Sequence, residues 1–179
     1  MTFITVLEEN CNELPLELSQ VKAFLKADYE EDEDEDGVIL RSFRTAIGQC
    51  EGKINRSIVW KKYILSTHSP IKNNFLRLFY GTVNSVKSVK ITDKNGLETV
   101  MSKDNYFLDS RRDCIFFKTS PGVFSRLDAV YAAKLATISD ELLQAILFHT
   151  AKIYEDKTGY CPIPRGSLNI YKKYREIRL

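Results

Sequence analysis

The sequence lacks every short motif that commonly marks an enzyme. It contains no G-x-S-x-G, H-E-x-x-H, P-loop or G-x-G-x-x-G pattern. There are only two histidines: His68 lies in a turn beside Ser69-Pro70, and His149 lies in an apolar helical stripe, which is typical of a core or interface residue. We therefore predict that the protein is not an enzyme. The catalytic alternative is a pair of carboxylates that only folding would bring together.

Cysteine is also sparse. Cys11, Cys50, Cys114 and Cys161 are far apart, with no C-x-x-C pair and no nearby histidine. Zinc sites usually have closely spaced ligand pairs. We therefore expect no metal and no cofactor, and we interpret the cysteines as reduced, largely buried thiols of a protein in a reducing compartment.

Long hydrophobic runs are absent too. No apolar run approaches the ~20 residues that a membrane-spanning helix needs. The first nine residues are apolar but carry no basic leader, so we do not interpret them as a signal peptide. These features predict a soluble protein that is made in a cytoplasm and has no membrane partner.

Acidic residues, in contrast, are concentrated in one place. The net charge is +2, but without one run of seven acids the chain has 26 basic and 17 acidic residues, a net charge of +9. The run consists of Glu30, Glu31, Asp32, Glu33, Asp34, Glu35 and Asp36. Adjacent like charges repel, so we predict a solvated loop without the ligand spacing of a calcium site. The alternatives are repulsion of nucleic acid and pairing with a basic partner.

Apolar residues at helical spacing predict two helices in the first third of the chain. The first runs from about residue 17 to 27, behind Pro15, and the second from about 37 to 55. The apolar face of the second consists of Ile39, Phe43, Ala46, Ile47, Cys50 and Ile54. Gly48 and Gly52 lie four residues apart in it, which indicates either a smooth strip for packing of a neighbouring subunit or a slightly weakened helix.

The middle of the chain, from Ile58 to Leu135, is rich in β-branched and aromatic residues with recurring turn signals. The predicted strands are 59–65, 75–80, 83–92, 97–101, 106–108, 114–118 and 129–135. Asn95-Gly96 predicts a hairpin turn. Short strands with tight connections indicate an antiparallel sheet that folds into a small sandwich or barrel.

The last part of the chain begins with a strongly apolar helix, predicted from a capping residue, Ser139, to about residue 156. This should be the central helix of the fold. The segment after it is basic and tyrosine-rich, and its candidate functional residues are Tyr171, Lys172, Lys173, Tyr174, Arg175 and Arg178. Such residues suit a protein interface or nucleic-acid binding, and a frayed, solvated terminus is the third alternative.

Together these elements predict an α+β fold. It is a small helical bundle, made of two N-terminal helices and one C-terminal helix, with an inserted antiparallel β-domain and a C-terminal tail. The predicted parts are an N-terminal helical part at 1–57, the β-domain at 58–136, the bundle helix at 137–158 and an extended or helical docking tail at 159–179. All are expected in one compact domain.

The order of these elements resembles that of the head–tail connector, or adaptor, proteins of tailed phages and gene transfer agents. Residues 14–28 are similar to the opening of that family, a proline followed by a helix and an acidic stretch. The strand at 80–91, the hairpin at 93–96 with the following Asp104-Asn105-Tyr106, and the helix start at 138–147 also resemble the family's corresponding segments. The likeness covers nearly the whole chain.

The resemblance implies a structural subunit of a phage, prophage or gene transfer agent. Such subunits form a ring, usually of twelve copies, beneath the portal protein and join it to tail or stopper proteins in the virion neck. The ring extends the channel through which DNA passes without sequence-specific binding. This interpretation assigns the tail residues named above to docking on the portal and the acidic run to the channel or to a partner. It implies synthesis in the cytoplasm of a bacterial host. The alternative function is a small nucleic-acid-binding module that uses the basic, aromatic C-terminal tail.

Overall fold

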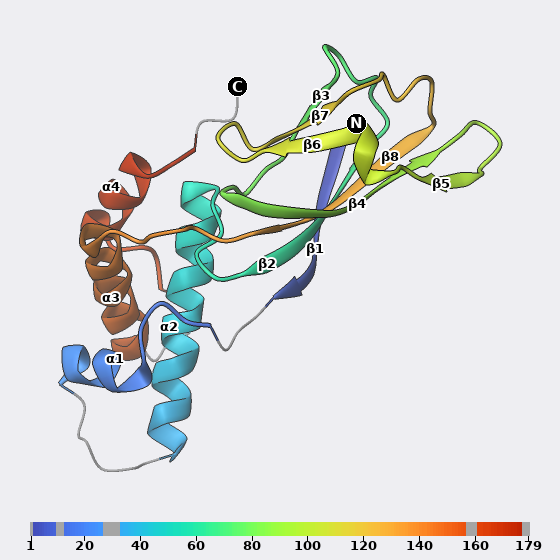
Figure 1. Ribbon diagram of the computed structural model, residues 1–179. Helices are drawn as coiled ribbons and strands as arrows, with labels where there is room; N and C mark the ends of the chain where they lie inside the picture. The colour runs from blue at the N-terminus through green and yellow to red at the C-terminus, as the bar shows by residue number, and fades with distance from the viewer. Residues whose placement is uncertain (1, 10–12, 27–32, 157–160, 177–179) are drawn as a thin grey trace. The chain divides into compact units, whose positions relative to one another are not determined.

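The computed structural model describes residues 2–9, 13–26, 33–156 and 161–176 (Figure 1). The chain divides into two compact units. The sheet unit comprises Met1–Glu13 and Val59–Ala136, and the helical unit comprises Leu14–Ile58 and Thr137–Leu179. None of the described helices is long and apolar enough to cross a membrane. The predicted α+β fold, with antiparallel strands inserted between helices, is confirmed.

Four helices are described in the helical unit. They are α1 (Leu18–Leu25), α2 (Glu33–Ile54), α3 (Asp140–Glu155) and α4 (Arg165–Lys173). α3 contacts each of the other three, as its broad apolar surface predicts. The six residues of the predicted apolar face of α2 are all buried, and α3 adds Leu142, Ala145, Ile146 and Leu147. The core of this unit is therefore made chiefly by α2 and α3.

Capping side chains determine where α1 and α3 begin. In α1, the side chain of Gln20 accepts a hydrogen bond from the backbone N–H of Glu17 at 3.0 Å. In α3, the hydroxyl of Ser139 accepts a hydrogen bond from the N–H of Leu142 at 3.3 Å. Each contact satisfies an N–H group that has no partner within its own helix. The cap at Ser139 is as predicted from the sequence.

The prediction of a loop for the whole acidic run is wrong, because its last four residues form the first turn of α2, which begins at Glu33. Two contacts stabilise this turn. Lys22 of α1 pairs with Asp36 at 2.6 Å, and the hydroxyl of Tyr154 donates a hydrogen bond to Glu35. The helix dipole also favours carboxylates at an N-terminus, so these contributions outweigh the repulsion between neighbouring acids. The other acids of the run lie outside the described residues: Glu30, Glu31 and Asp32.

Eight strands and one short 3-10 helix are described in the sheet unit. They are β1 (Thr2–Glu9), β2 (Lys61–Thr67), β3 (Phe75–Arg77), β4 (Val83–Thr92), β5 (Glu98–Val100), η1 (Lys103–Asn105), β6 (Tyr106–Asp109), β7 (Cys114–Phe117) and β8 (Arg126–Ala133). Seven of the strands match those predicted. The eight strands form a five-stranded sheet in the order β1-β2-β8-β4-β5 and a three-stranded sheet in the order β3-β7-β6. Every pairing is antiparallel.

The two sheets share one hydrophobic core, so the unit is a small sandwich. Leu65 of β2 and Leu127 of β8 come from the larger sheet, and Ile115 of β7 comes from the smaller one. Tyr131 of β8 lies at the centre and is fully buried. Its hydroxyl donates a hydrogen bond to the carbonyl of Phe79 at 2.9 Å. The buried hydroxyl of Tyr131 therefore has a hydrogen-bond partner within an otherwise apolar core.

The strand β1 is missing from the sequence-based prediction, which assigned residues 1–57 to a helical part. It pairs with β2 from Thr2 opposite Thr67 to Glu9 opposite Lys61, with a shift in register between Val6 and Glu8. Because β2 is its one neighbour in the sheet, β1 is an edge strand. Its partner is remote in the sequence, and strand preference depends on such neighbours more than on local pattern.

Candidate functional site

The C-terminal segment packs into the helical unit. α4 contacts α3 and α2. Its inner face includes Ser167, which is buried and whose hydroxyl donates a hydrogen bond to the carbonyl of Ala145 at 2.8 Å. Beyond α4, the N–H of Glu176 donates to the carbonyl of Ile54, at the end of α2, also at 2.8 Å. Residues 165–176 therefore contribute to the folded unit itself.

Tyr171, one of the predicted docking residues, is a core residue in the structure. It is fully buried, one helical turn after Ser167 on the same face of α4. Its hydroxyl lies 3.3 Å from Nδ1 of His149 and 3.4 Å from the carbonyl oxygen of Ala145. A side chain in this position cannot reach a partner protein, and it cannot stack on a base as the nucleic-acid alternative requires. The docking assignment of Tyr171 is therefore corrected.

Cys50, Tyr171 and His149 form a buried cluster whose residue types include a nucleophile and a base. The side chains of Cys50 and Tyr171 share a hydrogen bond. Burial raises the pKa of the Cys50 thiol far above its ordinary value, and burial lowers the pKa of His149. A reactive cysteine needs an exposed, electropositive environment that favours the thiolate. The cluster is therefore structural, with a protonated thiol and a neutral imidazole.

The buried His149 should make stability depend on pH. Its pKa lies below the ordinary value of about 6.5, so the unfolded chain binds a proton more readily than the folded chain. The stability contribution is then complete about one pH unit above 6.5 and decreases as the pH falls through 6.5, by at most about 1.4 kcal/mol per pH unit. We expect urea unfolding to show this loss between about pH 7.5 and about pH 5.5, and the variant His149→Gln to show a smaller slope. An identical slope in both proteins would contradict this assignment.

Lys173 and Tyr174 are held by the start of α3. The ammonium of Lys173 lies 2.6 Å from the carboxylate of Glu141, and the hydroxyl of Tyr174 donates to the same carboxylate at 3.1 Å. The hydroxyl of Ser139 donates to Tyr174 at 2.7 Å. The bonds from Lys173 and Tyr174 lower the pKa of Glu141, and the bond to Glu141 raises the pKa of Lys173. These residues tie the end of α4 to α3.

Among the predicted docking residues, Lys172, Lys173 and Arg175 are exposed, and Lys173 differs from the other two because its ammonium pairs with Glu141. Lys172 and Arg175 are one turn apart and follow the buried Tyr171, so they lie on the outer side of the C-terminal segment. Arg178 lies outside the described residues. The structure thus divides the six candidates into a core residue, two residues bound to α3, two other exposed cations and one residue that is not described.

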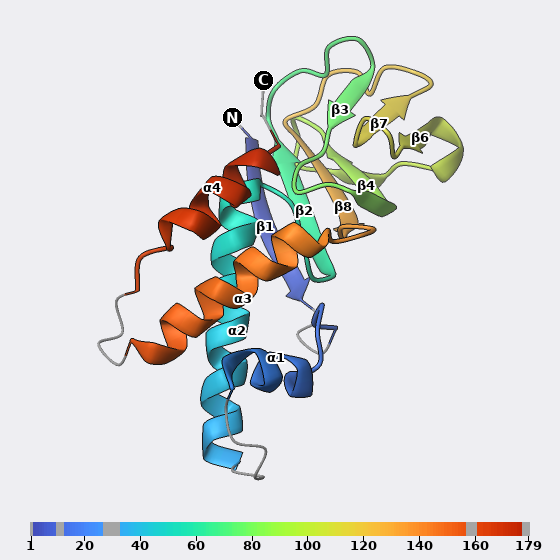
Figure 2. The ribbon, with the colours of Figure 1, turned by 90° about the vertical axis from the view of Figure 1, so that its left-hand side faces the viewer.

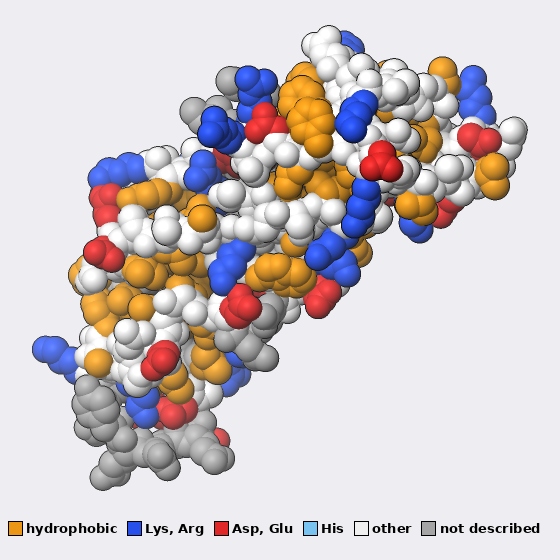
Figure 3. Space-filling view, in the orientation of Figure 1, with side chains coloured by type: hydrophobic (Ala, Val, Ile, Leu, Met, Phe, Trp, Pro, Cys, Tyr) orange, Lys and Arg blue, Asp and Glu red, His pale blue; other side chains and the backbone are white. Residues whose placement is uncertain are grey.

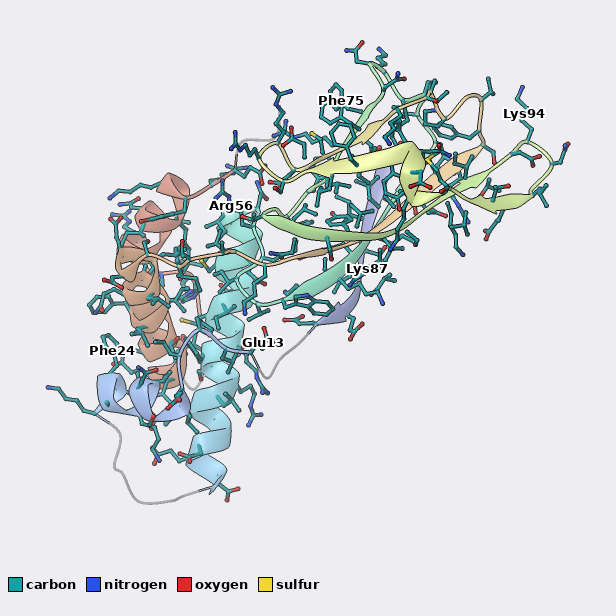
Figure 4. The ribbon with its side chains drawn as sticks, in the orientation of Figure 1. Glu13, Phe24, Arg56, Phe75, Lys87 and Lys94 are labelled. Atoms are coloured by element: carbon teal, nitrogen blue, oxygen red, sulfur yellow. The ribbon has the colours of Figure 1, made fainter. Side chains whose placement is uncertain are left out.

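A groove of about 480 Å³ runs between α3 and α4. It is lined by Ala145, Phe148, Ala151, Lys152, Glu155, Pro164, Gly166, Ser167 and Ile170. Phe148 is 57% exposed and meets Phe24 of α1 edge to face, with ring centroids 5.4 Å apart. Phe24 is labelled in Figure 4. The sequence predicts an apolar α3 but not this groove, because the groove depends on where α4 packs.

The predicted glycine strip lies on the surface of α2. Gly48 and Gly52 are exposed, and a Cβ atom built on either would meet nothing within 4 Å. No neighbouring element among the described residues therefore requires glycine there. Packing of a neighbouring subunit on this strip stays a prediction.

The structure also describes the possible metal-binding residues and part of the acidic run. Among the described residues, no group of three His, Cys, Asp or Glu side chains is placed to hold a metal ion. In the described part of the acidic run, Asp34 is exposed, whereas Glu35 and Asp36 are half-buried and bonded to Tyr154 and Lys22. The candidate residues that the structure leaves accessible are therefore surface residues of the helical unit: Asp34, Gly48, Gly52, Lys172, Lys173 and Arg175.

Comparisons with known proteins show which solved structures share this fold. A chain in the neck of an empty gene transfer agent particle, computed with C6 symmetry, superposes with a TM-score of 0.79 and 18% sequence identity. The alignment covers 99% of this chain and 97% of that one. This chain has the fold of a gene transfer agent neck protein. A chain in the neck of the native particle, computed with C12 symmetry, gives a TM-score of 0.74 at 19% identity, covering 99% and 97% of the two chains.

A further structural match is a chain in the virion of the native gene transfer agent particle, with a TM-score of 0.76 at 19% identity and coverage of 98% and 96%. No protein-family model and no curated protein matches the sequence. The neck-protein fold is therefore visible in the structure while the sequences have diverged. The resemblance to connector proteins that the sequence suggests is confirmed at the level of the fold.

Proposed function

We propose that the protein is a structural, non-enzymatic head–tail connector subunit of a phage-like particle. The observation that carries this proposal is the end-to-end match with neck chains, which leaves almost no part of either chain unaligned. The inert Cys50–Tyr171–His149 cluster supports a role without chemistry. The protein would be made in the bacterial cytoplasm and incorporated into the virion neck, between the portal and the tail or stopper proteins.

The subunits would assemble into a ring of twelve copies. The C6 and C12 symmetries of the neighbouring neck structures support this part of the proposal. A closed ring of identical chains needs two different surfaces on each chain, one complementary to the other. The subunit therefore has to offer at least two separate interaction surfaces in addition to any portal-docking surface.

We place portal docking on Lys172 and Arg175, since both are exposed cations near the end of α4, whereas the exposed Lys173 is already paired with Glu141. An acidic cleft on the portal would attract them, and exposed interface charges contribute chiefly to association rate and specificity. Removing residues 160–179 would be a poor test, because it would also remove Tyr171 and Ser167 from the core. Charge reversal at the two exposed positions avoids this problem.

The double variant Lys172→Glu/Arg175→Glu should bind the portal protein of the same particle at least about tenfold more weakly, a loss of about 1.4 kcal/mol. The measurement is biolayer interferometry with immobilised portal. The matched control is Lys87→Glu/Lys94→Glu, which makes the same charge change at two exposed positions of the sheet unit (Figure 4). Equal affinity of the docking variant and the control would contradict this placement.

The acidic run would keep the ring from holding passing DNA. Each phosphate contact adds salt-dependent affinity, so a channel that must release DNA benefits from carboxylates on its wall. Replacing all seven acids by Asn or Gln should increase DNA retention by the assembled ring at low salt and reduce infectivity or transfer. Unchanged DNA retention and unchanged transfer would contradict the placement of the acidic run on the channel wall. The variant's helical circular dichroism would verify that α2 still folds.

A further inference from the structure

Three phenylalanines form a row across the smaller sheet. Phe116 of β7 pairs with Phe75 of β3 on one side and with Phe107 of β6 on the other. The ring centroids of Phe107 and Phe116 are 5.5 Å apart, and those of Phe75 and Phe116 are 5.9 Å apart. We refer to Phe75, Phe116 and Phe107 as the aromatic row.

The aromatic row lies on the outer face of the sandwich. The next residues along the strands, Leu76 and Ile115, are buried in the core, and side chains alternate between the two faces of a strand. Phe107 is 52% exposed and Phe75 is 38% exposed. Figure 3 shows hydrophobic side chains gathered at the surface over β3, β6 and β7, and Figure 4 shows Phe75 there. Paired aromatic residues exposed together in this way mark an interaction surface.

The orientation of the rings favours a protein partner over a nucleic acid. Phe107 and Phe116 stack with an interplanar angle of 13°, so their faces are turned toward each other. Stacking on bases requires a ring face that is open to solvent. The faces that Phe107 and Phe116 share are therefore closed to a base, and the remaining exposed surface of the row suits packing against apolar side chains.

Basic residues flank the aromatic row. Arg77 follows Phe75 by two residues and Lys118 follows Phe116 by two, so both lie on the same face as the row. Arg111 and Arg112 are exposed just after β6. The acid among them, Asp109, accepts hydrogen bonds from the N–H groups of Arg111 and Arg112. A complementary surface would therefore combine apolar side chains with carboxylates.

Strand β1 combines exposed apolar side chains with carboxylates. Phe3, Val6 and Leu7 are each about half exposed, at 48%, 48% and 50%. The strand ends in Glu8 and Glu9, whose partly exposed side chains pair with Lys62 and Lys61 at 3.5 Å and 3.2 Å. β1 is also an edge strand, because its second backbone edge pairs with no strand in the described part of the chain, and proteins usually cover or protect such an edge.

The aromatic row and β1 lie on different sides of the sheet unit. Figure 2 shows β1 at one side of this unit and β6 and β7 at the other. Two different, complementary surfaces on separate sides of one unit are what a head-to-tail contact between copies requires.

We propose that the aromatic row of one copy packs against β1 of the next copy around the ring. This inference rests on the proposed function, because it names the subunit contact of the proposed ring. Phe75, Phe116 and Phe107 would cover exposed apolar side chains on one face of β1, with Leu7 among them, and Lys118 would lie near Glu8 and Glu9. Aromatic residues at the centre with charges at the rim are the usual composition of a protein interface.

The first test is the mass of the complex that the protein forms with the portal. Phe107→Glu should reduce the fraction of protein in rings at least tenfold. The matched control is Val123→Glu, which places the same charge on a 79% exposed apolar residue of the same unit, outside both surfaces. The control should assemble like the wild type. If Phe107→Glu assembles as well as the control, this inference is overturned and the proposed ring stands.

A charge exchange tests the pairing of the two surfaces. Lys118→Glu alone and Glu8→Lys alone should each weaken the ring, and the double variant should restore most of the assembly. Restoration cannot result from a damaged fold, since both changes are then present in one chain. Failure of the double variant to restore assembly, with its thermal stability unchanged, would contradict the pairing.

Cross-linking identifies the partner surface directly. In a background with Cys11→Ser and Cys161→Ser, the variant Leu7→Cys/Phe107→Cys should form a covalent ladder with a short bis-maleimide. Each variant that has only one of the two introduced cysteines should stay monomeric on a denaturing gel, because the remaining Cys50 and Cys114 are buried. Dimers from Phe107→Cys alone would show that the row packs on itself, which overturns the inference. A wild-type protein that never forms rings with the portal would overturn the proposed function instead.

Discussion

Replacing Tyr171 by alanine is expected to lower the free energy of unfolding by about 3–5 kcal/mol. The side chain is fully buried between α3 and α2, and its hydroxyl lies within hydrogen-bond distance of His149 and Ala145. The variant loses the burial of an aromatic ring and leaves a cavity, and it also leaves buried polar atoms with one partner fewer. The effect should be among the largest for any single residue of α4.

The measurement is urea unfolding followed by helical circular dichroism. Two variants separate the contributions: Tyr171→Phe keeps the ring and should cost about 1–2 kcal/mol, and Lys172→Ala, at the exposed neighbour, should stay within about 0.5 kcal/mol of the wild type. If Tyr171→Ala were as stable as Lys172→Ala, α4 would not be packed on the bundle. Tyr171 would then return to the set of docking candidates.

Replacing Gly81 by alanine should destabilise the sheet unit by about 2–4 kcal/mol. A Cβ atom at this position would lie 2.0 Å from Oδ2 and 2.4 Å from Cγ of Asp113, far inside contact distance. Asp113 cannot simply turn away, because its Oδ1 accepts a hydrogen bond from the N–H of Val83 at 2.7 Å. Val83 begins β4 and is fully buried, so this bond lies beside the core.

Thermal unfolding of Gly81→Ala, compared with Gly48→Ala, measures this effect. Gly48 has open space around it in the middle of α2, so alanine there should leave stability unchanged or raise it by up to about 1 kcal/mol. The double variant Gly81→Ala/Asp113→Ala removes the clash and should be less destabilised than the sum of the two single variants. Simple additivity would show that Gly81 and Asp113 do not interact as described.

Local pattern predicts most of the fold. The apolar face of α2, the cap at Ser139, and the strands from β2 to β8 follow from spacing and from turn residues within short windows. The buried environment of His149 was also expected, because the residue lies in a helical stripe with Ile146 and Ile153. Interactions of this kind involve residues that are close in sequence, so their pattern is visible before folding.

The features that the sequence does not predict depend on contacts between residues that are far apart in the sequence. β1 becomes a strand because β2 is available beside it, and Tyr171 becomes a core residue because Cys50 and Ala145 lie opposite it. The acidic turn of α2 depends on Lys22 and Tyr154 in other helices. The aromatic row likewise requires the register of three strands, although each of its phenylalanines belongs to a predicted strand.

The most direct test of the proposed function is the mass of the purified protein, measured by multi-angle light scattering, alone and with the portal protein of the same particle. We predict a ring with the portal, whose connector part has a mass of about twelve times the 20.6 kDa of one chain. The charge-reversed variant Lys172→Glu/Arg175→Glu should fail to join it. A chain that stays monomeric and ignores the portal would contradict the connector function, and steeply salt-dependent binding to DNA would then support the nucleic-acid alternative.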